Sequence, residues 1–202
     1  MNTLKVPRLE GFQSLGQFAK SSLDCVPWSA DFPYKPKVDF AVAHDGERLF
    51  IRFDVEEKNV KAVTTKSNGP VWEDSCAEFF VRVPGSAFYY NFETNCIGAG
   101  LAAKRTSRSE CVHFGEDKMA QIMRRSSLPF SPVDAGPGKW SLELEIPFAL
   151  FCEGEAVPQV LEANFYKCGD KTSEPHFLSW SPIDTPSPDF HRPEFFGRLI
   201  LE

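Results

Sequence analysis

Alternation between apolar and polar residues is the feature of this sequence that most restricts how the chain can fold. Every second residue is apolar from Leu49 to Val55 and again from Trp140 to Ile146, and Pro147 ends the second run. Successive side chains of a β-strand point to opposite faces, so a period of two predicts a strand with one face in a core. Helical periodicity is scarce and the sixteen prolines are spread along the chain, which favours an all-β protein.

Other segments of similar character, separated by turn residues, predict further strands. These segments are Val38–Ala43, Cys76–Val83, Phe88–Thr94, Lys118–Arg124, Ala163–Cys168 and Phe195–Leu201. The turn signals are Asp45-Gly46, Asn68-Gly69-Pro70, Pro84-Gly85, Gly136-Pro137-Gly138 and Gly169-Asp170. A single helical turn is predicted at Phe148–Cys152. Eight or more short strands without crossover helices predict a β-sandwich of two antiparallel sheets, immunoglobulin-like or jelly-roll, in one domain over residues 1–202.

Composition and charge restrict the partners of the chain. The 13% aromatic content includes nineteen Phe, which predicts a core filled by rigid rings. A net charge of −6 argues against a nucleic-acid partner, which requires a clustered basic surface. The short basic cluster Lys104, Arg105 and Arg108 is interpreted as a solvated loop. No apolar run approaches the ~20 residues of a membrane-spanning helix, so no membrane partner is expected.

The N-terminal residues and the cysteines say less about where the chain is located and whether it holds a metal or disulfides. Residues 1–8 lack the apolar core of a secretion signal, which indicates a cytoplasmic chain or one whose signal has been removed. None of the six cysteines has CxxC spacing, so the sequence gives little support for a zinc site, and a domain of this size does not need disulfides. Cys76 and Cys168 lie in predicted strands, where buried thiols are expected.

The first candidate for binding chemistry surrounds Trp72. This Trp precedes Asp74 and a predicted strand in which Glu78 points to the polar face. A flat indole can stack on the C–H face of a sugar ring, and carboxylates accept hydrogen bonds from its hydroxyls at roughly 1.5–3 kcal/mol each. The alternative is that Trp72 is a core aromatic and Asp74 caps a turn.

A second candidate is the predicted strand that follows. Tyr89, Asn91, Glu93 and Asn95 share one of its faces. Such a polar wall suits a ligand rich in hydroxyls or a cation held by oxygen ligands, and a solvent-facing sheet surface explains it equally well.

The third candidate is near the C-terminus. Trp180 precedes a proline-rich loop, which indicates a side chain on a binding loop. His191, between Phe190 and Arg192, is interpreted as a hydrogen-bonded structural histidine.

These segments together resemble a known family. The run from Trp72 to Phe80, followed by Asn91-Phe92-Glu93 and Ser179-Trp180, is similar to carbohydrate-binding module family 9. Those modules are attached to xylanases and belong to a wider group of sandwich domains that includes the DOMON domains. The C-terminal run from Phe190 to Gly197 resembles the ending of a stand-alone subgroup, and the resemblance spans roughly residues 39–201.

The resemblance implies a non-catalytic sugar-binding module associated with polysaccharide breakdown, whose relatives are often secreted. In the family two Trp side chains clamp a terminal sugar, which here implies a clamp of Trp72 and Trp180 with Glu78 as hydroxyl acceptor. Arg105 is the nearest candidate for the family's Arg contact. The family also binds structural calcium, although no compact Asp-rich loop matches such a site. The ligand-binding residues predicted on all these grounds are Trp72, Asp74, Glu78, Asn91, Glu93, Arg105 and Trp180.

Two other functions remain open at this stage. A glycoside hydrolase requires two carboxyl groups roughly 5–5.5 or 6.5–9.5 Å apart. Asp74 and Glu78 in one strand would be about 13 Å apart, although Glu93 from a neighbouring strand could close the gap. A haem module requires an axial ligand, for which Met119 and Met123 on one predicted strand face are candidates; core packing is the alternative for both.

Overall fold

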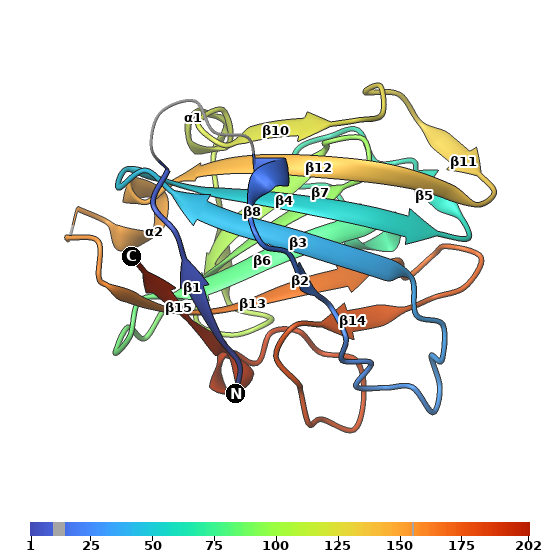
Figure 1. Ribbon diagram of the computed structural model, residues 1–202. Helices are drawn as coiled ribbons and strands as arrows, with labels where there is room; N and C mark the ends of the chain where they lie inside the picture. The colour runs from blue at the N-terminus through green and yellow to red at the C-terminus, as the bar shows by residue number, and fades with distance from the viewer. Residues whose placement is uncertain (10–14, 155) are drawn as a thin grey trace.

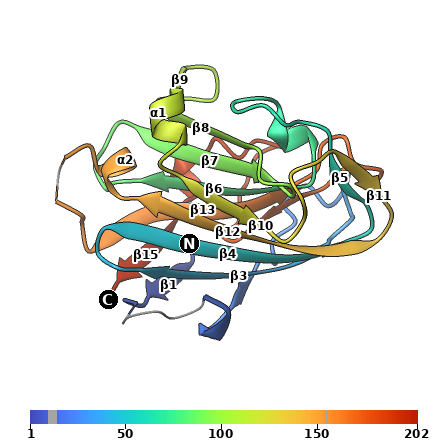
Figure 2. The ribbon, with the colours of Figure 1, turned by 90° about the horizontal axis from the view of Figure 1, so that it is seen from above.

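Two sheets packed face to face form the molecule (Figures 1 and 2). The computed structural model describes residues 1–9, 15–154 and 156–202. The larger sheet runs β1 (Thr3–Val6), β15 (Gly197–Leu201), β13 (Val160–Cys168), β6 (Cys76–Arg82), β7 (Tyr89–Asn95), β8 (Gly100–Arg105) and β9 (Cys111–His113), with β14 (Phe177–Ser179) also paired to β13. The five-stranded sheet runs β10 (Met123–Ser126), β12 (Gly138–Pro147), β4 (Arg48–Glu57), β3 (Lys37–His44) and β2 (Ser21–Ser22).

The remaining elements are short. β5 (Val60–Ala62) pairs with β11 (Val133–Ala135), and the helical turns are η1 (Leu15–Gln17), η2 (Val71–Glu73), α1 (Glu116–Met119), α2 (Ala149–Cys152) and η3 (Pro193–Phe195). All strand pairs are antiparallel except β1 with β15, which joins the two ends of the chain side by side. The predicted β-sandwich and the helical turn before Cys152 are confirmed. No helix in the described part of the chain is long and apolar enough to cross a membrane.

One predicted strand is wrong. Residues 118–124 form the end of α1, a turn and only the start of β10. Met119 and Ile122 are both buried and lie three residues apart, which is a helical spacing. Met119 packs in the core from α1, whereas Met123 lies on β10 and is 38% exposed. The two methionines therefore do not share a strand face as a pair of axial ligands would need.

The main core lies between the sheets and follows the alternation read from the sequence. On β4 and β12 the apolar residues face inward, and the register places Leu142 opposite Phe53 and Leu144 opposite Ile51. From the larger sheet Phe79, Phe92 and Phe165 pack into the same core, with ring centroids of Phe79 and Phe165 5.1 Å apart. Rings of this size fill the space between two sheets about 10 Å apart.

The second face of the larger sheet is also covered at its centre. Alternate residues of β6, β7 and β13 point away from the main core and meet aromatic residues from the segments before β3 and after β14. Phe190, for example, stacks on Tyr166 with ring centroids 4.1 Å apart. This second cluster leaves a pocket beside it, so the central strands have one face in the core and the other at the candidate site.

An ion pair is buried within the sandwich. Lys167 of β13 and Glu57 of β4 lie 2.9 Å apart with fully buried side chains, so the pair joins the two sheets. Trp140 Nε1 donates a hydrogen bond to Glu57 Oε1, and His176 Nε2 lies 2.7 Å from Lys167 Nζ. A buried charge left without its partner is costly, because the protein interior solvates it poorly.

We expect Lys167→Met to lower the free energy of unfolding by about 3–5 kcal/mol, since it leaves the Glu57 carboxylate buried and unpaired. The double variant Lys167→Met/Glu57→Leu should recover most of that loss because it removes both charges. Urea unfolding measures both values. Lys171→Met serves as the control, since its ion pair with Glu73 is solvent-exposed and contributes below about 1 kcal/mol. Equal effects of Lys167→Met and Lys171→Met would contradict this assignment.

Candidate functional site

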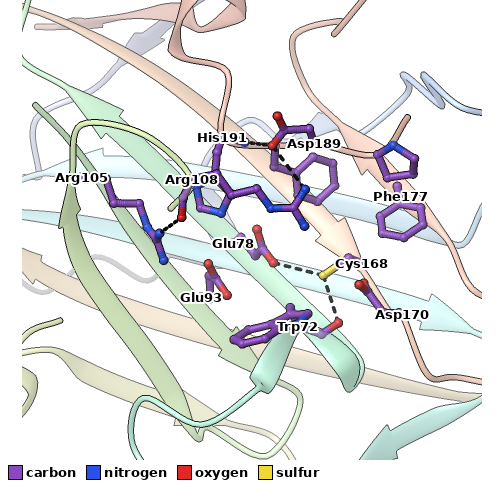
Figure 3. Close-up of a pocket in the computed structure, with 12 residues that line it drawn as sticks. Trp72, Glu78, Glu93, Arg105, Arg108, Cys168, Asp170, Phe177, Asp189 and His191 are labelled. Atoms are coloured by element: carbon purple, nitrogen blue, oxygen red, sulfur yellow. Dashed lines mark hydrogen bonds and ion pairs between the residues drawn. The ribbon is translucent and has the colours of Figure 1, made fainter. Parts of the chain in front are cut away.

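A pocket of about 270 Å³ opens on the outer face of the larger sheet (Figure 3). Strands β6, β7, β8 and β13 provide its floor, and the loops around residues 72, 108, 177 and 190 provide its walls. The residues that line it are Trp72, Glu78, Glu93, Arg105, Arg108, Cys168, Asp170, Phe177, Pro188, Asp189, Phe190 and His191. Strand register brings the floor together, because residues directly opposite each other on neighbouring strands share a face.

Two carboxyl groups lie at the floor of the pocket. Glu78 and Glu93 are opposite each other on β6 and β7, and they are only 2% and 4% exposed. Glu78 Oε1 accepts a hydrogen bond from Cys168 Sγ at 3.1 Å, and Glu93 Oε1 accepts one from Asn91 Nδ2 at 2.8 Å. Glu93 Oε2 is buried and has no hydrogen-bond partner in the part of the chain that the structure describes. A buried acceptor without a partner costs free energy, so this oxygen is suited to a donor supplied by a ligand.

Burial raises the pKa of both groups. For Glu78 the loss of solvation has the largest effect, and the nearby charge of Glu93 raises the pKa further. For Glu93 burial again dominates, opposed by the hydrogen bond from Asn91 and the charge of Arg105. Asp170, at the side of the pocket, has its pKa raised to about 6 by burial and by the charge of Glu73. These acids can therefore hold a proton nearer to neutral pH than exposed carboxyl groups do.

Arg105 is held at the edge of the floor. Its Nε donates to Asn91 Oδ1 at 2.7 Å and its Nη1 to the carbonyl of Arg108 at 2.7 Å, so a chain of hydrogen bonds runs from Arg105 through Asn91 to Glu93. The interpretation of this basic cluster as a solvated loop is wrong for Arg105, which is 7% exposed and lies on β8. Strand alternation turns Arg105 to the same face as Tyr89, directly opposite it on β7.

Trp72 forms one wall of the pocket. It lies in η2 next to fully buried Val71, and its indole remains 38% exposed. The carbonyl of Trp72 accepts hydrogen bonds from the backbone N–H of Asp170 at 3.2 Å and from Cys168 Sγ at 3.5 Å. The buried neighbours and these bonds fix the backbone while the ring faces the pocket (Figure 3).

Asp74 lies behind this wall and not in the pocket. Its carboxylate is fully buried and accepts hydrogen bonds from the backbone N–H groups of Val63 and Thr64 and from Asn95 Nδ2. Asp74 therefore organises the turn before β6, in agreement with the alternative interpretation that Asp74 caps a turn. Asn95 belongs to the same network, since its Oδ1 accepts from the backbone N–H of Ala99.

Trp180 also lies away from the pocket. It is 6% exposed and packs in the main core against Phe40 and Phe165. A Cβ at Gly197 would come within 2.5 Å of its ring, so the indole fills the space that this glycine leaves open. Trp180 and Trp72 do not face each other as a clamp. The aromatic side chains that line the pocket with Trp72 are instead Phe177, Phe190 and the ring of His191.

The sequence carries no local signal that marks the residues of the wall opposite Trp72 as part of the site. Arg108, Asp170, Asp189 and Phe190 come from turns and loops, and Phe177 from the start of the short strand β14; the positions of all five depend on long-range packing. Cys168 is different, because its place on β13 opposite Cys76 follows from strand pairing. Alternation alone could have put it on the face of Glu78 once the pairing of β6 with β13 was known.

Calcium does not fit the cluster of His, Cys, Asp and Glu side chains that the structure brings together. Within residues 1–9, 15–154 and 156–202, the group of three close candidate ligands is Cys76, Glu78 and Cys168. Calcium takes six to eight oxygen ligands, whereas two of these three donors are sulfur.

His191 is hydrogen-bonded, as its sequence context indicated. Its Nδ1 lies 3.1 Å from the hydroxyl of Tyr89, and its ring lies 5.0 Å from that of Phe80. Burial, together with the smaller effect of the charges of Arg105 and Arg108, lowers the pKa of His191 to about 3. The imidazole is therefore neutral at neutral pH.

This lowered pKa makes the stability contribution of His191 depend on pH. Below pH 6.5 the unfolded chain protonates the imidazole and the folded protein does not, so stability falls as pH falls towards 3. We expect the stability of wild type relative to His191→Asn to decline by up to about 1.4 kcal/mol per pH unit between pH 6 and 4. Urea unfolding at several pH values measures the difference. The matched control is His113→Asn at an exposed position, where a much smaller dependence is expected. A difference for His191→Asn that does not change with pH would contradict the prediction.

Comparisons with known proteins agree with this architecture. The family model described as carbohydrate-binding family 9 matches residues 10–201. Among curated proteins no match is found. A crystal structure from Bacteroides uniformis ATCC 8492, of a candidate carbohydrate-binding protein, is 36% identical with a TM-score of 0.92 and covers 99% of each chain.

Two more distant structures share the fold. Both are family 9 modules from Caldicellulosiruptor kristjanssonii, one in complex with cellotriose and one with glucose. The first is 9% identical with a TM-score of 0.61 and covers 100% of this chain and 94% of that one. The second is 10% identical with a TM-score of 0.56 and covers 100% and 96%. The match of the family model over nearly the whole sequence shows that this chain belongs to carbohydrate-binding family 9.

Proposed function

We propose that this chain binds a carbohydrate in the pocket between Trp72 and the Glu78–Glu93 pair without cleaving it. The observation that carries the proposal is the placement of a half-exposed indole beside a buried carboxylate oxygen, Glu93 Oε2, that has no hydrogen-bond partner among the described residues. A sugar presents a C–H face to the indole and hydroxyl donors to the carboxylate, so one ligand class satisfies both.

The other lining residues and the volume of the pocket favour a small sugar as the ligand. Arg105 can donate to a ring or hydroxyl oxygen from its fixed position, while Asn91 holds it in place. Phe177 and Phe190 offer apolar surface across from Trp72. A cavity of about 270 Å³ is at the small end of ligand sites, which favours a single sugar or the end of a chain. We propose Trp72, Glu78, Glu93 and Arg105 as the direct contacts.

The glucose and cellotriose bound by the Caldicellulosiruptor modules make these two sugars the first ligands to test. A role in polysaccharide breakdown, including xylan, and a relation to the DOMON domains are parts of the same proposal. We also propose that residues 1–202 act as one domain, since both sheets share the main core.

We expect Trp72→Ala to weaken cellotriose or glucose binding at least about fivefold, because stacking on the indole contributes about 1 kcal/mol or more. The variant should unfold within about 1 kcal/mol of wild type, since the ring is half-exposed. Titration calorimetry and urea unfolding measure the two effects. Trp180→Ala is the matched control, and it should lose about 3–5 kcal/mol of stability because its ring is in the core. If Trp72→Ala binds sugar as tightly as wild type, the indole is not part of the binding site.

Hydrolysis is the second candidate function, and a specific observation favours it. Glu78 and Glu93 are direct cross-strand neighbours, with Cβ atoms about 4.5–5.5 Å apart by sheet geometry, and retaining glycosidases hold their carboxyl groups about 5–5.5 Å apart. Glu78 Oε1 is hydrogen-bonded to Cys168, however, and Glu93 Oε1 to Asn91, which favours binding over catalysis.

The variant Glu93→Gln distinguishes non-catalytic sugar binding from glycoside hydrolysis. We expect wild type to release no product from aryl glycosides, and Glu93→Gln to weaken sugar binding about tenfold or more because an amide nitrogen, which can only donate, replaces one of the two acceptor oxygens. The assays are product absorbance and titration calorimetry. Asp134→Asn, on β11 outside the pocket lining, is the control and should bind like wild type. Product formation by wild type that Glu93→Gln abolishes would make the protein an enzyme.

A further inference from the structure

Two thiols and a carboxyl group converge below the floor of the pocket. Cys76 and Glu78 are two residues apart on β6, and Cys168 is directly opposite Cys76 on β13, so strand geometry places all three on one face. Their ligand atoms lie within 4.8 Å of one another. The three side chains are 0%, 2% and 1% exposed, which makes the arrangement part of the fixed sheet and not of a mobile surface.

The distances around Cys168 match those across a tetrahedral metal site. Its Sγ lies 3.1 Å from Glu78 Oε1 and 3.5 Å from the carbonyl oxygen of Trp72 (Figure 3). A zinc ion bound at ~2.3 Å to sulfur and ~2.0 Å to oxygen holds adjacent sulfur and oxygen ligands about 3.5 Å apart. The Trp72 carbonyl is therefore already at the tetrahedral spacing from Cys168 Sγ, and Glu78 Oε1 is about 0.4 Å inside it.

Charge and access agree with a cation at this position. Among the described residues Glu78 has no ion-pair partner, and the nearest buried cation of β13, Lys167, is paired with Glu57. A thiol can donate only one hydrogen, so Cys168 cannot satisfy both Glu78 and the Trp72 carbonyl at once. Cys168 and Glu78 line the pocket, which gives an ion a path to the site.

We propose that Cys76, Cys168 and Glu78 bind a thiophilic divalent cation of the Zn²⁺ class, with the Trp72 carbonyl or a pocket water as fourth ligand. Sulfur donors select such ions over calcium and magnesium. Burial raises the pKa of the Cys76 thiol to about 12, so the metal-free site holds protonated thiols. Binding then forms two metal–sulfur bonds and one metal–oxygen bond, and both thiol protons, together with the proton that Glu78 holds when it is protonated, pass to the buffer.

Cadmium, which prefers the same sulfur ligands and gives an ultraviolet thiolate-to-metal absorption band, is the probe. We expect the reduced full chain to show this band, saturating at one equivalent with release of about two protons from the thiols and up to one more from Glu78. Cys76→Ala/Cys168→Ala should abolish the band. Cys25→Ala/Cys111→Ala, which removes the two partly exposed thiols, should retain it. A band that is absent from reduced wild type, or that survives in the first double variant, would overturn the proposal.

A second variant guards against an effect of the cysteine replacements on folding. Glu78→Gln keeps both thiols and should weaken cadmium binding at least about tenfold by removing a charged ligand, with cooperative thermal unfolding retained. Cadmium affinity equal to wild type in this variant would also overturn the site. Competition by Zn²⁺ should remove the cadmium band in wild type, and failure to compete would count against the proposed ion class. Sugar titration of the metal-free protein tests the proposed function separately, so either proposal can fail alone.

Discussion

The central strands of the larger sheet are buried on both faces, and the site depends on that constraint. On β6 and β7 the residues of one face, Phe79 and Phe92, pack in the main core. The residues of the other face include Phe80 and Tyr89, which pack under the C-terminal loops. A strand fixed from both sides cannot slip in register without moving apolar groups into the pocket and charges into the core. Glu78 and Glu93 are therefore held opposite each other with little freedom.

The larger sheet carries buried charged groups on both faces, and their surroundings differ. On the core side Lys167 is paired with Glu57 and surrounded by Trp140 and His176, so its charge is compensated within the protein. On the pocket side Glu93 keeps an oxygen that accepts no hydrogen bond from residues 1–9, 15–154 or 156–202. The free-energy cost of burying an unpaired polar group is comparable in both places, and only the pocket side offers access to a ligand. This difference is the physical basis for assigning a binding role to one cluster and a structural role to the other.

The two tryptophans show how position in the fold decides the role of a residue type. Trp180 follows β14 and points between the sheets, where Gly197 makes room for it. Trp72 lies on a short 3₁₀ turn whose neighbour Val71 provides the buried anchor. Family 9 membership and the shared fold accommodate this arrangement, because aromatic walls on loops can be supplied from different points of one scaffold.

The sequence by itself determined the fold class, most strands and the faces on which their residues lie, because the side-chain period of a strand is a local property. It thus put Glu78 with Cys76 and Glu93 with Asn91, and it singled out Trp72. It misjudged residues 118–124, where the helical spacing of Met119 and Ile122 prevailed over alternation. Only the tertiary structure decided that Arg105 turns into the pocket, that Trp180 is in the core and that the loops at Phe177 and Phe190 form the opposite wall. These outcomes depend on which strands pair and which loops cover them, and such contacts join residues far apart in the chain.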